Sequence, residues 1–133
     1  MPTELNGETL VNLKTAFGSA SALPISGTVT AIPQTSGTGT VTRQAVSVTN
    51  VTLKAANANR RGLTIYNNAP GGTANLFVKL GATAVITAGS ESYTVKIAPA
   101  GYYEVPFGYT GIVDGIWDAA DANGEALITE LTA

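Results

Sequence analysis

The sequence predicts an all-β protein: an antiparallel jelly-roll-like β-sandwich over residues 45–133, preceded by a short helix and an extended Thr/Gly-rich arm in residues 1–44. Two observations support this expectation. From residue 45 onward, short alternating apolar segments recur about every 8–12 residues, with Gly, Pro and Asn between them. Of one Trp, five Tyr and three Phe, all but Phe17 lie between Tyr66 and Trp117. Because aromatic side chains bury the largest areas, the main core is expected in the second half.

Residues 7–17 form the one helix that the sequence predicts. Asn6 is a suitable N-cap, and Gly18 a suitable C-terminal stop. Leu10 and Phe17 lie on one face of this helix. Since a helix this short is marginal on its own, we expect that face to dock against another surface.

Residues 19–45 are rich in Ser, Thr, Gly and Ala and hold too few large apolar residues for a core of their own. Residues 26–32 nevertheless have a strand-like composition, with Val29 and Ile32 among the apolar positions. We favour an extended arm, or a strand donated to a neighbouring subunit. The alternative is a flexible linker.

The predicted strands follow in order. Val46 and Val48 alternate with polar residues, and Val51 and Leu53 then alternate on the opposite parity, so a β-bulge or strand break is expected at Asn50. A turn cluster occupies residues 67–72. About eight short strands favour a sandwich, and among sandwiches a jelly roll. The further predicted strands are 62–66, 76–80, 84–86, 92–97, 102–105, 111–117 and 126–131.

Composition excludes several classes of site. The chain has 133 residues, of which 12% are charged, and it contains neither Cys nor His. This removes disulfides, thiolate zinc sites, cysteine nucleophiles and the commonest acid–base side chain. A net charge of −2 offers no electrostatic footprint for nucleic acid or anionic membranes. No signal peptide or apolar run of about 20 residues is present. We therefore expect a soluble protein made in the cytoplasm, without cofactor or enzymatic activity.

Residues 119–130 partly match a calcium-binding loop. Asp121, Asn123, Gly124 and Glu130 match positions 3, 5, 6 and 12 of an EF-hand loop, but Ala119 occupies the first ligand position. The flanking segments are predicted strands rather than helices. A hairpin turn at Asn123-Gly124 is therefore the favoured interpretation, and no metal site is predicted.

The dibasic pair Arg60-Arg61 has two interpretations. It could clamp a phosphate or a partner's carboxylate. The favoured interpretation is that it begins a strand and pairs with a local acid such as Glu104 or Asp114. Paired carboxylates could also cleave glycosides, but their spacing does not separate such a pair from a solvated rim, so no catalytic residue is assigned. The acids considered were Glu104, Asp114, Asp118 and Asp121.

Residues 101–111 are unusually aromatic. Exposed rings could stack on sugars, but core packing is favoured for most of them, with Tyr102 on the opposite face. Tyr102 and Tyr109 remain candidate interface residues, since Tyr is enriched at interfaces. Phe107 and Trp117 are expected in the core. The side chains at every second position are Tyr103, Val105, Phe107 and Tyr109.

Several segments together resemble small β-rich virion structural proteins of tailed bacteriophages, which are encoded among head and tail genes. The resemblance covers residues 45–133, and residues 23–30 look like the Pro-Val-Ser-Gly segments that precede such domains. It supplies no catalytic or ligand residues. The matching segments are 59–68, 74–81, 92–97, 101–111 and 115–117.

The resemblance implies a virion protein, and the chain's size favours a capsid decoration (cement) protein that binds the major capsid protein and itself. The alternative is a tail, fibre or baseplate component that binds host-surface glycans. A homo-oligomer is expected, with a trimer favoured over a dimer, and neither nucleic acid nor a membrane is an expected partner. The candidate interface residues are Leu10, Phe17, Val29, Ile32, Arg60, Arg61, Tyr102 and Tyr109.

Overall fold

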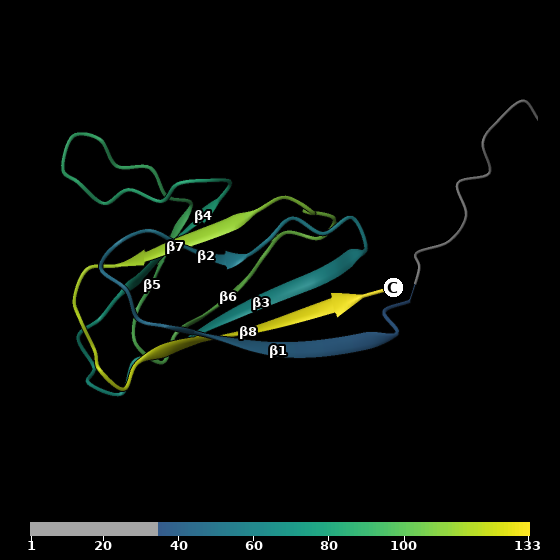
Figure 1. Ribbon diagram of the computed structural model, residues 1–133, viewed down its shortest axis with the longest axis horizontal. Helices are drawn as coiled ribbons and strands as arrows, with labels where there is room; N and C mark the ends of the chain where they lie inside the picture. Colours follow the sequence, from purple (N-terminus) through teal and green to yellow (C-terminus); the bar gives the residue numbers. More distant parts are fainter. Residues whose placement is uncertain (1–34) are drawn as a thin grey trace, which may run out of the picture. The chain divides into compact units, whose positions relative to one another are not determined.

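The computed structural model describes residues 35–133 (Figure 1). The predicted helix over residues 7–17 and most of the predicted arm lie outside the described residues. The same holds for four of the candidate interface residues, Leu10, Phe17, Val29 and Ile32.

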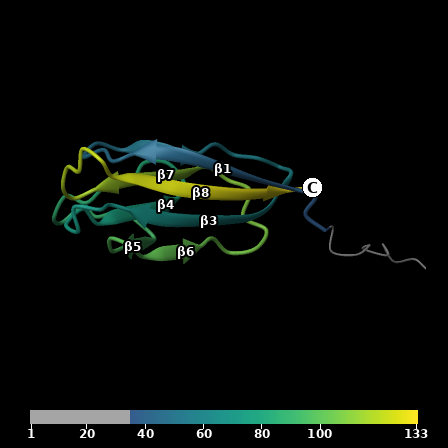
Figure 2. The same cartoon turned by 90° about the horizontal axis from the view of Figure 1, so that it is seen from below.

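Residues 35–133 form eight β-strands and no helix. The strands make two antiparallel four-stranded sheets: sheet A in the order β1-β8-β3-β6 and sheet B in the order β2-β7-β4-β5 (Figures 1 and 2). The predicted all-β class with two antiparallel sheets is confirmed for this part of the chain. The strands are β1 (Thr38–Ala45), β2 (Val51–Lys54), β3 (Arg60–Asn68), β4 (Leu76–Leu80), β5 (Val95–Ile97), β6 (Tyr102–Glu104), β7 (Val113–Trp117) and β8 (Glu125–Thr132).

The two sheets share one hydrophobic core, as in a β-sandwich. Alternation along β3 turns Leu63 and Ile65 inward, and Ile128 of β8 joins them from the same sheet. Leu76 of β4 and Trp117 of β7 meet them from sheet B, and all five are at most 1% exposed. The prediction that Trp117 belongs to the core is confirmed.

The parity shift at Asn50 is a strand break, as predicted. β1 ends at Ala45 in sheet A and β2 begins at Val51 in sheet B. The predicted strand at Val46 and Val48 is therefore wrong, because this segment crosses between the sheets. Val48 is exposed there, and the Val46 N–H donates to a loop carbonyl.

Residues 38–45 were assigned to the arm or to a donated strand, but they form β1 of this domain. β1 pairs along its whole length with β8 of the same chain, from Thr38 opposite Thr132 to Ala45 opposite Glu125. Thr is β-branched and suits a strand. The apolar surface that β1 lacks is supplied by β8. A count of the apolar residues within this segment therefore underestimated its tendency to join the sheet.

The turn at Asn123-Gly124 exists, but it is not a hairpin. The Gly124 N–H donates to the Asp121 carbonyl at 3.1 Å, which closes a tight turn. The strands on either side, β7 and β8, belong to different sheets. The turn therefore carries the chain across the sandwich.

Phe107 is not in the core: its side chain is 81% exposed. β6 ends at Glu104, and the Tyr109 N–H donates to the Pro106 carbonyl in a turn that includes Gly108 at φ 82°. Period-two alternation holds only in extended backbone. It therefore placed Val105 correctly in the core and failed beyond it.

Candidate functional site

The outward side of sheet A carries four of the seven large hydrophobic side chains that stay exposed in residues 35–133. Cross-strand pairing shows that they share one face, because residues directly opposite each other point the same way. Tyr66 lies opposite both Leu127 and Tyr102. We call the following set the outer face: Val41, Tyr66, Tyr102, Leu127 and Leu131.

Two glycines flank Leu131 on this face. Leu131 is opposite Gly39 of β1 and Gly62 of β3. A Cβ atom at these glycines would lie 3.3 Å and 3.2 Å, respectively, from a Leu131 methyl. The leucine side chain therefore lies between two positions without side chains, which leaves it open to a partner.

The charges at the outer face are paired with local groups. Arg43 and Glu125 form an exposed salt bridge of 3.4 Å. The Tyr102 hydroxyl donates to a Glu104 carboxylate oxygen at 3.1 Å. This hydrogen bond, together with the carboxylate's negative charge, raises the pKa of Tyr102 above its usual 10.0. Exposed pairs of this kind add little to the stability of the domain. Arg43 and Glu104 lie on the edge strands β1 and β6, so these pairs form a polar rim around the outer face.

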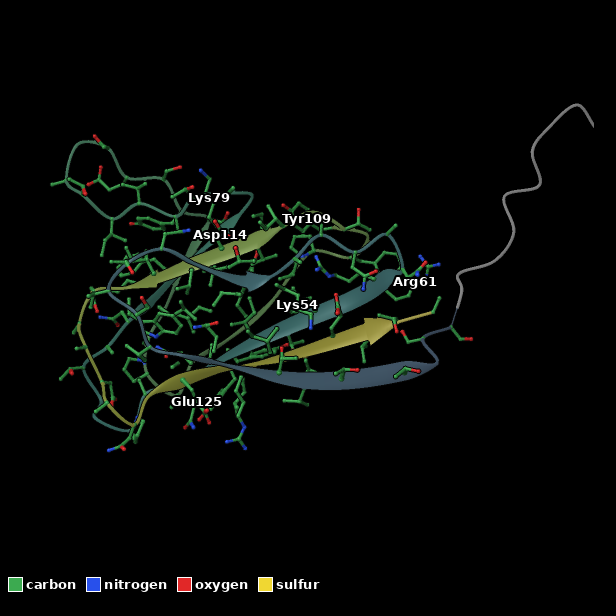
Figure 3. All side chains as sticks on the ribbon, in the orientation of Figure 1. Lys54, Arg61, Lys79, Tyr109, Asp114 and Glu125 are labelled. Atoms are coloured by element: carbon green, nitrogen blue, oxygen red, sulfur yellow. The ribbon has the colours of Figure 1, made fainter. Side chains whose placement is uncertain are left out.

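A groove of about 620 Å³ opens where the outer face meets the end of β3. Tyr66 and Asn68 line it from the strand, and two tight turns, residues 69–72 and 98–101, form its walls. Each turn has a proline at its second position and is closed by a backbone hydrogen bond of 3.0 Å or 2.8 Å. In Figure 3 the labelled Glu125, which is opposite Asn68 in the sheet, marks this end of the domain.

Asn67 lies between the two groove residues in the sequence but points into the core, where it is fully buried. Its side-chain amide donates to the Ala74 carbonyl at 2.9 Å and to the Ile97 carbonyl at 3.0 Å. Its backbone also pairs with the second turn, since the Ala100 N–H donates to the Asn67 carbonyl. Asn67 thus anchors the chain next to both groove walls. Its neighbours Tyr66 and Asn68 are thereby fixed in position beside the groove.

The first wall, residues 69–72, is also held by a hydrogen bond to Asp121. The Gly71 N–H donates to Asp121 Oδ2 at 2.9 Å. A Cβ atom at position 71 would lie only 2.9 Å from that oxygen, so a residue with a side chain would not fit here without a shift of Asp121. The other Asp121 oxygen accepts from the Asn123 N–H.

The second wall contains a strained residue. Ala100 has φ +62°, the one non-glycine with positive φ among residues 35–133. It occupies the third position of a proline turn, where glycine is usual. Such conformations persist only where the surrounding contacts impose them.

Arg60 is buried rather than available to a partner. Its Nε donates to Glu130 at 2.8 Å, and its other nitrogens donate to the carbonyls of Gly111 and Ala55. Arg60 begins β3 and pairs with an acid, as predicted. The acid is Glu130 and not Glu104 or Asp114, because Arg60 points into the sandwich beside β8, where Glu130 also points inward. Lys54 adds a second bond to Glu130, at 3.2 Å.

The Glu130 carboxylate has a pKa below its usual 4.5. Burial by itself raises this pKa, but the hydrogen bonds from Arg60 and Lys54 outweigh burial. Glu130 therefore belongs to an internal ion-pair network and does not complete an EF-hand loop. In residues 35–133 no three Asp or Glu side chains are placed to hold a metal ion together.

The remaining predicted residues are dispersed. Tyr109 is half-buried, and its hydroxyl donates to the Ile112 carbonyl at 2.8 Å. Figure 3 shows Arg61 at the end of the domain opposite Glu125. Buried Asp114 of β7 accepts from the side chains of Asn50 and Thr52, whereas Glu104 belongs to β6 of the other sheet.

Tyr102 is thus the one predicted interface residue of this part of the chain that lies on the outer face, at 62% exposure. The sequence does not single out these groove residues: it predicts Tyr66 as the end of a strand, and Asn67 and Asn68 as part of the turn cluster 67–72, whereas β3 continues to Asn68. The available signal was an Asn directly after the strand that ends at Tyr66, since strands disfavour Asn unless it has a specific partner.

Comparison with protein-family models, with curated proteins and with solved structures finds no significant match for this chain. Among the described residues, no helix has the length and apolarity needed to span a membrane.

Proposed function

We propose that this chain is a non-catalytic structural protein of a bacteriophage virion. In this proposal it is a capsid decoration protein that binds the major capsid protein and other copies of itself. The observation that supports it most directly is the outer face of sheet A, which is apolar, aromatic and open. The resemblance of residues 45–133 to small virion proteins supports the same role.

The strand order supports a jelly roll as the finer description of the sandwich. The first strand pairs with the last, the second with the seventh, the third with the sixth and the fourth with the fifth. Every connection except that between β4 and β5 crosses from one sheet to the other. This nested pairing is the arrangement of jelly rolls, which are common in viral capsid and lectin domains.

The chemistry of the outer face suits protein binding. Tyr66 and Tyr102 offer large areas with few rotatable bonds, and Leu131 lies between two glycines that let a partner approach. The charged pairs on this face are at its rim, so few charges need to lose water when a partner binds. A stable interface needs about 800 Å² from each partner.

The test is occupancy on purified heads that lack the protein, measured after adding the full chain. Leu131→Glu places a charge between Gly39 and Gly62, at one end of the outer face, and is expected to reduce occupancy at least about tenfold. Phe107→Glu is the matched control, because Phe107 is exposed but lies outside this face. If the Leu131 variant folds and occupies heads as the unmodified chain does, the outer face is not the capsid-binding surface.

A tail, fibre or baseplate component that binds glycans is the second candidate. The groove beside Tyr66 favours it, because jelly-roll domains also serve as lectins. Localisation of the protein on particles by immunogold labelling separates the two. Label on head faces supports decoration, and label on tail tips supports glycan binding.

A further inference from the structure

The groove at the end of β3 has the features of a pre-built site for a small ligand. Its volume of about 620 Å³ lies within the usual range of small-molecule sites, roughly 300–1,000 Å³. One aromatic ring, Tyr66, and one amide, Asn68, line it together with alanines and prolines of the two turns. Apolar walls with a few polar groups are typical of such sites.

Prolines and hydrogen bonds within the domain hold both walls of the groove. Each turn contains a proline, and Asn67 hydrogen-bonds to the chain beside each of them. Asp121 holds the first turn through the Gly71 N–H. A rigid site loses little conformational entropy on binding, so even a small ligand can be held.

Ala100 supplies an independent indication. Its backbone adopts φ +62°, where glycine would carry no strain, and Ala100 is one of the residues that line the groove. Strained residues of this kind are concentrated at ligand sites.

The polar groups at the mouth of the groove make only long, weak hydrogen bonds to one another. Asn68 Nδ2 lies 3.5 Å from Glu125 Oε1, and Arg43 lies 3.4 Å from the same oxygen. Both distances exceed the 2.7–3.2 Å of a good N–H···O bond. A ligand hydroxyl that approaches this pair from the groove would accept from Asn68 Nδ2 and donate to Glu125 Oε1 at ordinary hydrogen-bond distances.

Charge limits the class of ligand. None of the residues that line the groove is charged, and Glu125 lies beside it as a carboxylate. The nearby cation Arg43 already faces that carboxylate. These features disfavour an anion and favour a neutral molecule that has both apolar faces and hydroxyl groups.

We propose that this groove binds a neutral pyranose unit of a glycan, with a face of the sugar ring against Tyr66 and hydroxyls hydrogen-bonded to Asn68 and Glu125. A proline-rich peptide fits less well, because grooves for such peptides are lined by several aromatic rings and this one has a single ring. The inference rests on the second candidate function for its biological meaning, but the binding itself is a property of the isolated chain.

The test is an amide NMR titration of the full chain with glucose, galactose, mannose and N-acetylglucosamine, followed by an array of neutral and sialylated glycans. The expected result is a selective shift of the Asn68, Gly72 and Ala100 amides by at least one neutral sugar, with a dissociation constant on the order of 1 mM. Tyr66→Ala should weaken binding at least about tenfold, and Tyr66→Phe should retain it, because the ring makes the contact. Phe107→Ala, which removes an exposed ring elsewhere, should leave binding unchanged.

Three outcomes overturn the proposal: no neutral sugar shifts the groove amides, binding is confined to sialylated glycans, or a Pro-rich peptide binds there and sugars do not. Equal affinity of folded Tyr66→Ala and the unmodified chain also overturns it. None of these outcomes bears on the decoration role, because that role is read from head occupancy of the Leu131 variant, whose substitution lies outside the groove.

Discussion

Trp117 donates its indole N–H to Oδ1 of Asn67 at 3.1 Å, between two fully buried side chains that are 50 residues apart in the chain. Trp117 belongs to sheet B and Asn67 to sheet A. Asn67 also donates to the Ile97 carbonyl of β5, so two buried hydrogen bonds of this side chain join the two layers. The same asparagine amide holds the chain beside both walls of the groove.

Asn67→Leu should destabilise the domain by about 3–5 kcal/mol. The substitution leaves the Trp117 N–H and the carbonyls of Ala74 and Ile97 buried without this partner, and each such group costs about 1–3 kcal/mol. Chemical denaturation followed by Trp fluorescence gives the free energy of unfolding. Asn68→Ala, at the neighbouring outward position, is the control and should change it by less than about 0.5 kcal/mol.

Trp117→Ala and Phe107→Ala should behave oppositely, although the sequence placed both in the core. Trp117 is fully buried, so its removal leaves a cavity and should cost about 3–5 kcal/mol. Phe107 is 81% exposed, and its removal should cost less than about 0.5 kcal/mol. Denaturation midpoints by circular dichroism report both, and similar losses for the two variants would contradict the placement of Phe107.

The stability of the domain should decrease in acid because of Glu130. Its folded-state pKa is lowered, so its contribution is complete above the unfolded value of about 4.5 and is lost as the pH falls through the lower folded value. Glu130→Gln should flatten this part of the curve of unfolding free energy against pH. At neutral pH it should cost about 3–5 kcal/mol, because the buried Arg60 loses its counter-charge.

The matched control for this pH dependence is Glu125→Gln. Its carboxylate pairs with Arg43, whose side chain is 74% exposed. That exposed pair should contribute at most about 1 kcal/mol. An acid-induced loss that is the same in Glu130→Gln and in the unmodified chain would show that another carboxylate is responsible.

Ala100→Gly should leave the stability of the domain unchanged or raise it by up to about 1 kcal/mol. Glycine removes about 1–2 kcal/mol of strain at positive φ, and the greater freedom of the unfolded chain offsets part of this gain. Ala100→Val should be destabilising, since a β-branched residue tolerates this conformation worst. Thermal unfolding midpoints compare the two variants, and a more stable valine variant would contradict the assigned backbone conformation.

Two truncations test where the folded domain begins. Removal of residues 1–34 keeps all eight strands, whereas removal of residues 1–44 deletes nearly all of β1 and exposes the edge of β8. The shorter truncation should retain a cooperative unfolding transition, because all eight strands are kept. The longer one should lower the midpoint or aggregate, because an exposed strand edge invites pairing between chains. Equal midpoints would show that β1 adds nothing to the fold.

The amount that could be predicted differs between the strands and the site. Short apolar segments identified β3 and β4 closely, because each strand turns two apolar residues into the shared core: Leu63 and Ile65 of β3, and Leu76 and Val78 of β4. The candidate site was predicted only at Tyr102. The partner of Arg60 and the role of Asn67 were missed, because both depend on residues brought close by strand pairing rather than by spacing in the chain.

For residues 35–133 the sequence by itself determined the all-β class, the strand break at Asn50 and the burial of Trp117, because the two-residue period and the aromatic content are local properties. Only the tertiary structure decided that residues 38–45 join this domain, since β8 provides the surface against which they pair. It also decided that Phe107 is exposed and that Tyr66 and Asn68 flank a groove held by Asn67. These outcomes depend on which strands become neighbours and on where the extended backbone ends, and neither property is encoded in a short stretch of residues.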